Sequence, residues 1–236
     1  MIAIAKTHPG KVRSSNQDSY LLREEATCLY AVADGMGGHR GGNVASAMAV
    51  EALQRLDLSA QPSPVHLREA VEAANDAIWE RQLTDLSLSG MGTTLTVLWA
   101  GQDSLLVAHV GDSRLYLIRN GEMHQITQDH TYVNDLLASG SITQLEAENH
   151  PKRNMLVRAV GVDEYVQVDT GEFTLQPGDI MLLCSDGLTN MVTEEAIQTV
   201  LEARNCHDPA ASLVECAKAG GGTDNISVIV VKYNEE

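Results

Sequence analysis

Four aspartates in this sequence each stand next to a run of apolar residues. Asp34, Asp112 and Asp186 each follow such a run, and Asp224 precedes the last one. Short apolar runs are typical of buried strands, so each carboxylate is expected at a strand end. If these strands share a core, their ends could lie along one rim. Two interpretations stay open: solvated carboxylates that lie apart, or carboxylates held together by cations.

The second interpretation predicts a site for a hard divalent cation. Ionised carboxylates repel one another strongly in a poorly solvated site unless cations lie between them. Oxygen ligands without a Cys or His partner favour Mg²⁺ or Mn²⁺ over zinc. Gly35 follows Asp34 in a glycine-rich stretch, and glycine lets the backbone approach another group closely.

Six short motifs occur in order: Arg13-Ser-Ser-Asn-Gln-Asp18, Asp34-Gly-Met-Gly-Gly38, Met91-Gly-Thr-Thr94, Gly111-Asp-Ser-Arg114, Ser185-Asp-Gly-Leu188 and Gly222-Thr-Asp-Asn225. Together they resemble the metal-dependent Ser/Thr protein phosphatase family, type 2C, in its compact bacterial form. The resemblance covers nearly the whole chain. It implies hydrolysis of phosphoserine and phosphothreonine in proteins, which reverses Ser/Thr kinase signalling.

The resemblance also implies a metal centre. Asp34 matches an aspartate that bridges two metal ions, and the carbonyl of Gly35 matches a ligand of the second ion. Asp186 and Asp224 match further ligands of the first ion, and Asp18 matches an acidic position that acts through a metal-bound water. Two such cations could share a water and activate it for in-line attack on phosphorus.

A third, weaker metal site is implied at Asp112 together with Asp186. The alternative for Asp112 is a turn residue whose carboxylate pairs with Arg114. The cofactors expected from the resemblance are therefore two to three Mn²⁺ or Mg²⁺ ions. The residues do not choose between these two metals, because hard oxygen ligands accept both.

Arg13 matches the residue that holds the substrate phosphate, since a planar guanidinium meets two phosphate oxygens at once. The alternative is a surface ion pair with Asp18 or Glu24. Where many eukaryotic members have a candidate general acid, this chain has Met36, which cannot donate a proton. His39 on the same loop could handle the leaving group instead, or a metal-bound water could. The alternative for His39 is a histidine hydrogen-bonded to the backbone.

Composition limits the partners. The 236 residues carry a formal net charge of −16, which disfavours nucleic acid and anionic membranes. No apolar stretch approaches the roughly 20 residues of a membrane span. We expect a cytoplasmic monomer that acts on phosphoproteins, and the family's bacterial members suggest that these include a cognate Ser/Thr kinase.

The elements that position these residues are strands in clusters and helices in pairs, which indicates an α+β fold. The resemblance implies a four-layer α-β-β-α sandwich, with two antiparallel sheets and a helix pair on each outer face. The first helix pair is expected at 41–56 and 65–83. Their buried stripes are predicted to be Val44, Ala47, Met48, Leu53 and Leu56 in the first, and Leu67, Val71, Ala74 and Ile78 in the second.

We expect residues 1–236 to form a single catalytic domain. The segment at about 129–161 interrupts the strands with short helical pieces and matches the family's flap beside the site. Long excursions between core strands are often lids or binding loops, so the flap is expected to tune which phosphoproteins bind.

Other catalytic classes are excluded by spacing. No Cys has an Arg six residues later, no glycine-rich stretch ends in Gly-Lys-Ser/Thr, and there is no His-Glu-x-x-His. One alternative is an inactive relative that binds phosphoproteins, although Asp34, Asp186, Asp224 and Arg13 are all in place. A second alternative is a dedicated phosphatase of one regulatory protein.

Overall fold

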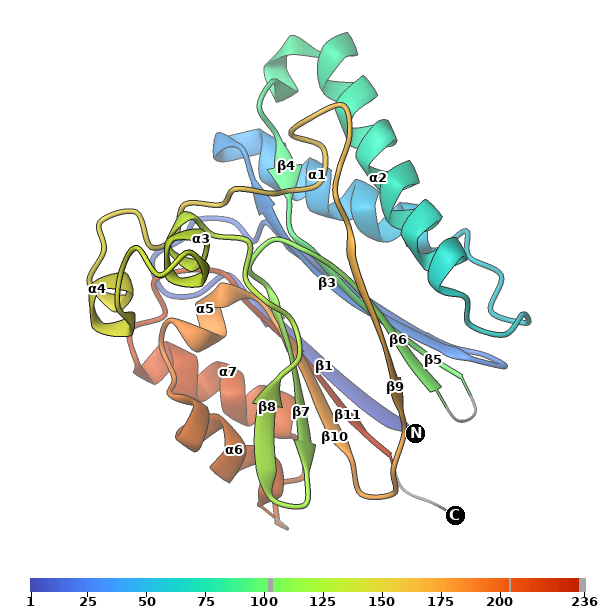
Figure 1. The fold of residues 1–236 in the computed structure, drawn as a ribbon, viewed down its shortest axis with the longest axis vertical. Coiled ribbons are helices and arrows are strands. Elements are labelled where there is room, and N and C mark those ends of the chain that lie inside the picture. The colour runs from blue at the N-terminus through green and yellow to red at the C-terminus, as the bar shows by residue number, and fades with distance from the viewer. Residues whose placement is uncertain (102–103, 204, 234–236) are drawn as a thin grey trace.

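Two antiparallel β-sheets stack face to face and carry helices on their outer faces (Figure 1). The computed structural model describes residues 1–101, 104–203 and 205–233. Every strand pairing in these ranges is antiparallel. This arrangement confirms the α+β sandwich that the resemblance implied.

The chain's first and last strands are neighbours in the five-stranded sheet. Its order is β1 (Ile2–His8), β11 (Ile226–Lys232), β10 (Ile180–Cys184), β7 (Arg114–Arg119) and β8 (Glu122–Gln125). Asn120-Gly121 forms the turn of the hairpin between β7 and β8. Both residues have positive φ, 54° and 79°, as a two-residue hairpin turn with this sequence requires.

The six-stranded sheet is built around a long strand that carries Asp34. Its order is β2 (Asp18–Glu24), β3 (Cys28–Met36), β5 (Leu95–Ala100), β6 (Ser104–Val110) and β9 (Asp169–Thr174), and the short β4 (Gly92–Thr93) also pairs with β3. We expected β3 to end before Asp34. It continues through Met36 because Gly35 and Met36 pair with β4.

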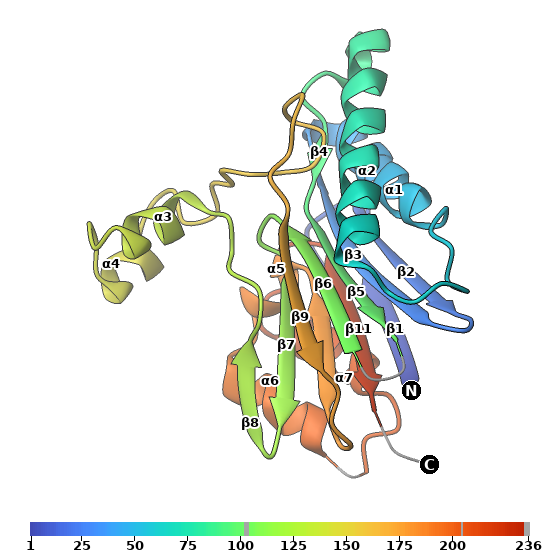
Figure 2. The same cartoon turned by 45° about the vertical axis from the view of Figure 1, so that its right-hand side comes forward.

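Helices cover both outer faces. The six-stranded sheet is covered by α1 (Gly38–Leu53) and α2 (Pro64–Thr84), which the short 3₁₀ helix η1 (Leu86–Leu88) follows. The five-stranded sheet is covered by α5 (Asp186–Thr189), α6 (Glu194–Glu202) and α7 (Pro209–Ala219). Two short helices, α3 (Tyr132–Ala138) and α4 (Gln144–Glu148), project sideways from the sandwich (Figure 2).

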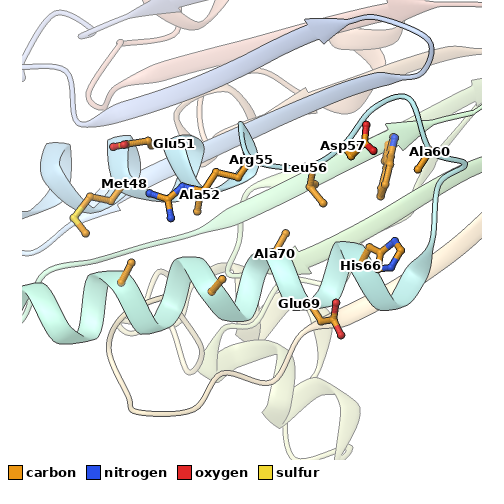
Figure 3. Close-up of a pocket in the computed structure, with 13 residues that line it drawn as sticks. Met48, Glu51, Ala52, Arg55, Leu56, Asp57, Ala60, His66, Glu69 and Ala70 are labelled. Atoms are coloured by element: carbon orange, nitrogen blue, oxygen red, sulfur yellow. The ribbon is translucent and has the colours of Figure 1, made fainter.

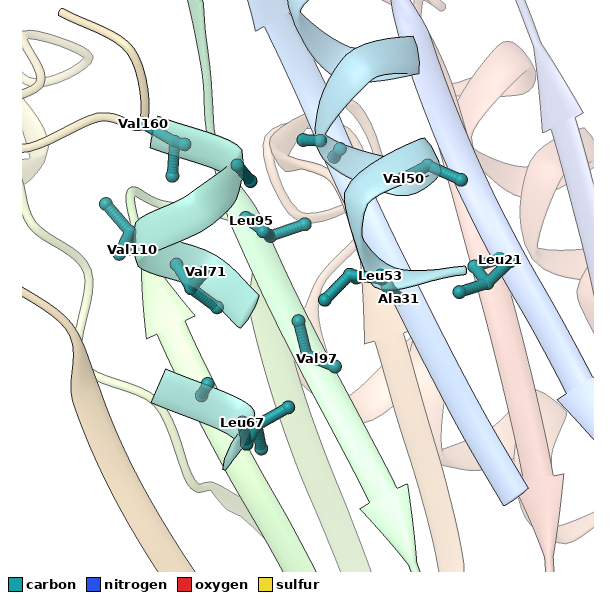
Figure 4. Close-up of a cluster of buried hydrophobic side chains, with 14 of the residues drawn as sticks. Leu21, Ala31, Val50, Leu53, Leu67, Val71, Leu95, Val97, Val110 and Val160 are labelled. Carbon is teal, nitrogen blue, oxygen red and sulfur yellow. The ribbon is translucent and has the colours of Figure 1, made fainter. Parts of the chain in front are cut away.

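Three apolar clusters hold these layers together. One lies between the six-stranded sheet and its helices, where Leu53, Leu67 and Val71 meet Val97 (Figure 4). A second joins the five-stranded sheet to α6 and α7, and the third fills the space between the two sheets. Because apolar contacts fix each layer, the strand ends are rigid supports for polar side chains.

The two predicted helix stripes had different outcomes. In α2 all four predicted residues are fully buried. In α1 the prediction was right in full only for Leu53, while Ala47 is exposed and Val44 and Met48 are half-buried against the core. The helix was expected at 41–56 but ends at Leu53, so the half-buried Leu56 lies beyond it. The fully buried residues on that helix also include the small Ala45 and Ala49. Helix α1 lies so close to β3 that only small side chains fit over its first turns.

None of the helices in the described ranges has the length and apolar composition needed to cross a membrane.

Candidate metal centre

One cleft at the end of the sandwich gathers most of the predicted site residues. It has a volume of ≈ 650 Å³. Those that line it are Arg13, Asp34, Gly35, Asp112, Asp186 and Asp224. Loops from both sheets contribute to it, and the flap contributes Asn154 and Leu156. Asp18 lies just behind the cleft and is 8% exposed.

Two threonine hydroxyls hold the backbone of Asp34. Its N–H donates to the Thr94 hydroxyl at 2.9 Å, and its carbonyl accepts from the Thr93 hydroxyl at 2.9 Å. The following Gly35 has no room for a side chain, because a Cβ there would lie 2.0 Å from the carbonyl oxygen of Gly42. Gly35 therefore brings the start of α1 against the strand end and keeps its own peptide beside the cleft.

Asp18 and Asp186 each have one buried oxygen without a hydrogen-bond partner, Oδ1 in both. The other oxygens are satisfied: the Ser185 hydroxyl donates to Asp18 Oδ2 at 2.8 Å, and Asn190 donates to Asp186 Oδ2 at 2.9 Å. A buried carboxylate oxygen without a donor is costly, so these two oxygens point to an additional positive partner.

The carboxylates raise one another's pKa. Burial raises the pKa of Asp34 well above its usual value, and Asp18, Asp186, Asp112 and Asp224 add repulsion in that order. Burial also raises the pKa of Asp18 to about 6, and burial with repulsion from Asp186 raises the pKa of Asp112 to about 8. Burial and then Asp224 raise the pKa of Asp186. A cation would relieve this repulsion.

Asp112 is not paired with Arg114, which was its alternative interpretation. The Arg114 guanidinium instead makes a fork on Asp129, with Nη2 2.7 Å from Oδ2 and Nε 2.9 Å from Oδ1. Asp112 follows Gly111, whose φ is +110° and whose missing Cβ would lie 2.6 Å from the side chain of Thr94. The Gly111-Asp112 turn therefore packs directly against Thr94, whose hydroxyl accepts from the N–H of Asp34.

Arg13 pairs with neither of the acidic residues considered in its alternative interpretation. Its Nη2 donates to Asp224 Oδ2 at 2.8 Å, and the arginine side chain is 51% exposed at the mouth of the cleft. The guanidinium is therefore next to the carboxylate cluster and accessible from solvent, as a phosphate-binding group must be.

Asn225, for which no role was predicted, organises the loop that carries Arg13. The Asn225 side chain accepts from the backbone N–H of Gln17 at 2.8 Å and donates to the carbonyls of Pro9 and Ser15 at 3.0 and 2.9 Å. It is 4% exposed. Its sequence signal is its place as the last residue of the motif Gly222-Thr-Asp-Asn225, directly after Asp224.

His39 lies in the first turn of α1, and its side chain is outside what the structure describes. Its role stays a prediction. Met36, at the position where many eukaryotic members have a histidine, lines the cleft.

A second hollow, of ≈ 490 Å³, lies between α1 and α2 (Figure 3). Its lining includes apolar side chains such as Met48, Ala52 and Leu56, and none of the six motifs contributes a residue to it. Charged and titratable side chains, among them Glu51, His66 and Glu69, also line it, but the predicted site residues are gathered in the first cleft.

The residues of the cleft fit divalent cations. No three His, Cys, Asp or Glu side chains in the described ranges form a ready-made ligand set, and Arg13 occupies one oxygen of Asp224. The donors are nevertheless all oxygens, two of them buried without a partner, and their carboxyls repel one another. Hard cations with oxygen and water ligands suit this donor set.

Comparison with known proteins agrees with this chemistry. The model of the protein phosphatase 2C family matches residues 9–215. A serine/threonine phosphatase, stp, of Listeria innocua is 40% identical over 243 residues, which cover 99% of this chain and 96% of that protein.

Solved structures give the same result. A serine/threonine phosphatase of Mycobacterium tuberculosis, PstP/Ppp, has a TM-score of 0.92 and 39% identity, and the match covers 99% of each chain. A catalytic domain of PstP in complex with two manganese ions has a TM-score of 0.89 and 38% identity, over 99% of this chain and 98% of that one. The chain belongs to the protein phosphatase 2C family.

Proposed function

We propose that this chain hydrolyses phosphoserine and phosphothreonine in proteins with the help of divalent metal ions, and so reverses the action of Ser/Thr kinases. The observation that carries the proposal is the cleft itself: four aspartates, two unpartnered buried oxygens nearby and one accessible arginine. Relatives named as Ser/Thr phosphatases over almost the whole chain support the same reaction.

Two to three Mn²⁺ or Mg²⁺ ions, when bound, supply an activated water as the nucleophile. Asp34 and the carbonyl of Gly35 would hold two of them together, with Asp186 and Asp224 on the first. Asp18 would act from behind the cleft, since its free Oδ1 is able to accept from an ion's water. Asp112 and Asp186 would hold the third, weaker ion.

Arg13 binds the phosphoryl group of the substrate. Its guanidinium is accessible at the mouth of the cleft and is held near the carboxylates by Asp224. A planar fork contacts two phosphoryl oxygens and stabilises the charge that develops on them during in-line displacement. His39 would aid departure of the serine or threonine oxygen.

We further propose that residues 1–236 act as one catalytic domain in the cytoplasm, as a monomer, with the flap at about 129–161 as its substrate-selecting part. Asn154 and Leu156 of the flap line the cleft, which supports contact with substrate side chains beside the phosphoresidue. The phosphoprotein substrates would include a cognate Ser/Thr kinase, and a dedicated phosphatase of one regulatory protein is a narrower form of the same function.

The decisive experiment is release of phosphate from a phosphothreonine peptide by the purified chain. Mn²⁺ and Mg²⁺ are titrated after removal of metal with EDTA, and Asp34→Asn and Asp186→Asn are assayed beside the wild type. Activity that requires metal and is lost in both variants supports the proposal. A folded wild-type chain without turnover at any metal concentration would instead favour an inactive, phosphoprotein-binding relative, which metal-dependent binding of the same peptide would then test.

A further inference from the structure

His130 connects three parts of the molecule that meet beside the cleft. It lies between β8 and α3, is 4% exposed, and belongs to none of the motifs used above. Its partners are the turn that carries Asp112, both ends of the flap, and the first residue of β9.

The first connection is to Gly111, which His130 holds from both sides. The backbone N–H of His130 donates to the Gly111 carbonyl at 2.7 Å, and the Gly111 N–H donates to Nδ1 of the His130 ring at 3.1 Å. Gly111 in turn packs against Thr94, whose hydroxyl accepts from the N–H of Asp34. The turn before Asp112 is therefore fixed between Thr94 and one imidazole.

The second connection uses the opposite ring nitrogen. Because Nδ1 is an acceptor, the ring proton is on Nε2, which lies 3.0 Å from Asp169 Oδ2 and donates to it. Asp169 also accepts from Arg158 Nη1 at 2.9 Å, and that guanidinium nitrogen lies 3.3 Å from His130 Nε2. The imidazole and the guanidinium thus share one carboxylate at the start of β9.

The third connection joins the two ends of the flap. The carbonyl of His130 accepts from the N–H of Val157 at 2.9 Å. The next residue, Thr131, forms an isolated bridge with Leu156, which lines the cleft. A change at His130 therefore reaches the flap surface that faces the substrate.

We propose that His130 is a positioning residue with two separable roles, one for each ring nitrogen. Nδ1 holds the Gly111-Asp112 turn in the place where Asp112 serves the reaction. Nε2, through Asp169, fixes the base of the flap, where 130–131 meet 156–157, for binding of the phosphoprotein. The proposal rests on the phosphatase function proposed above and adds a residue to it.

Two substitutions separate these roles. In His130→Asn the amide oxygen stands near the position of Nδ1, so the bond from Gly111 is retained and the bond to Asp169 is lost. In His130→Gln the longer side chain places its amide nitrogen near the position of Nε2, so the bond to Asp169 is retained and the Gly111 N–H is left without an acceptor. Each variant loses about one buried hydrogen bond, which corresponds to an effect on the order of tenfold.

Kinetics with two substrates give opposite expectations for the pair. His130→Gln is expected to lower kcat about tenfold on both a small aryl phosphate and a phosphothreonine peptide. His130→Asn is expected to raise KM for the peptide about tenfold while its kcat on the aryl phosphate stays closer to wild type. Equal losses by both variants on both substrates, or no change in either variant, would overturn the proposal.

Two further measurements do not depend on turnover. Calorimetric titration with Mn²⁺ alone is expected to show that the site of lowest affinity binds Mn²⁺ more weakly in His130→Gln than in His130→Asn. Hydrogen–deuterium exchange is expected to be faster at 154–158 in His130→Asn, and faster at 111–113 in His130→Gln. These two measurements test the contacts of His130 even if the wild type hydrolyses no phosphopeptide. Absence of hydrolysis would contradict the proposed phosphatase function and not the role of His130.

Asp169→Asn provides an independent variant that leaves the buried ring intact. It weakens the hydrogen bond between His130 Nε2 and Asp169 by changing the acceptor. It is expected to reproduce the increase in KM of His130→Asn. If the His130 variants do not fold, this variant decides whether Nε2 fixes the base of the flap. An unchanged KM for the peptide together with unchanged exchange at 154–158 would overturn that role.

Discussion

Asp18 lies directly opposite Asp34 in the antiparallel pairing of β2 with β3. Two acidic residues facing each other across strands destabilise a sheet. Here Asp18 also contributes the strongest repulsion on Asp34. The pair therefore stores unfavourable electrostatic energy at the place where cations are expected to bind.

Asp34→Asn separates stability from function. Removing one charge from the cluster is expected to raise the melting temperature of the metal-free protein in EDTA, because less repulsion remains. In Mn²⁺ the order should reverse, and activity should fall by at least about 100-fold, since loss of a ligand costs more than loss of a residue that only supports one. Thermal melts in EDTA and in Mn²⁺ measure the change in stability, and phosphate release from a phosphothreonine peptide measures the loss of activity. Glu72→Gln, an exposed change on α2, is the control and should change neither.

The pH dependence of stability has a defined sign. Asp18 and Asp112 have folded pKa values of about 6 and about 8, above the ordinary 3.8. Such carboxyls bind more protons in the folded than in the unfolded chain, so their contribution is complete below pH 3.8 and is lost as the pH rises through the folded pKa. The metal-free protein in EDTA is therefore expected to lose stability between about pH 4 and about pH 8.

Asp112→Asn is the matched test of that trend. It should flatten the upper part of the decline, towards pH 8, and leave the part near pH 6 in place. Urea unfolding in EDTA at several pH values measures this. A wild-type stability that rises over the same range would show that the carboxylates are not crowded.

Arg13 is expected to act on the substrate more than on the fold, since its side chain is 51% exposed. Loss of a charged hydrogen-bonding partner costs about 1.5–3 kcal/mol, so Arg13→Ala should reduce kcat/KM on a phosphopeptide by roughly 10- to 100-fold. Arg13→Lys keeps the charge without the fork and should fall in between. Weaker inhibition by inorganic phosphate should accompany both losses, and equal inhibition in all three proteins would contradict the assignment.

His39→Ala tests the leaving-group role. A general acid contributes about 10²–10⁴-fold, so kcat on a phosphothreonine peptide should fall by about 100-fold and the alkaline limb of its pH–rate profile should disappear. An aryl phosphate, whose leaving group needs no proton, should be hydrolysed nearly as fast as by the wild type. If kcat and the pH–rate profile on the peptide stay unchanged, the leaving group is protonated by something else.

Arg119 and Asp179 form a structural pair far along β7 from the cleft. Two contacts of 2.8 and 2.7 Å join them, and the Asp179 side chain is 1% exposed. Arg119→Met should destabilise the fold by on the order of 3 kcal/mol, because it leaves a buried carboxylate without its cation. Urea unfolding measures the loss. Arg81→Met breaks an exposed pair with Asp85 and should have little effect, so similar losses from both variants would refute the distinction.

The sequence predicted the elements that follow their own periodicity. The stripe of α2 was correct because its spacing alone selects one face. The stripe of α1 was only partly right because its buried face depends on how closely α1 approaches β3 through Gly35 and Gly42, which periodicity does not report. The continuation of β3 to Met36 likewise depends on β4, a partner more than 50 residues away in the chain.

At the cleft, the motifs predicted which carboxylates would meet but not what holds them. Asp34, Asp112, Asp186 and Asp224 carry a local signal, because each ends or begins an apolar run. His130 and Leu156 carry none, since their importance comes from contacts between a flap and a distant turn. The ion pair between Arg13 and Asp224 was also missed, because it joins residues 211 positions apart.

The pairing of β1 with β11 has a consequence for folding during synthesis. Of the described strands β11 is the last to leave the ribosome, yet it lies between β1 and β10 and is preceded by Asp224. A chain still being synthesised therefore has an open five-stranded sheet and an incomplete cluster of carboxylates. Contacts between such distant segments form late in folding. The carboxylate cluster is therefore expected to be complete only after β11 has been synthesised and has paired with β1 and β10.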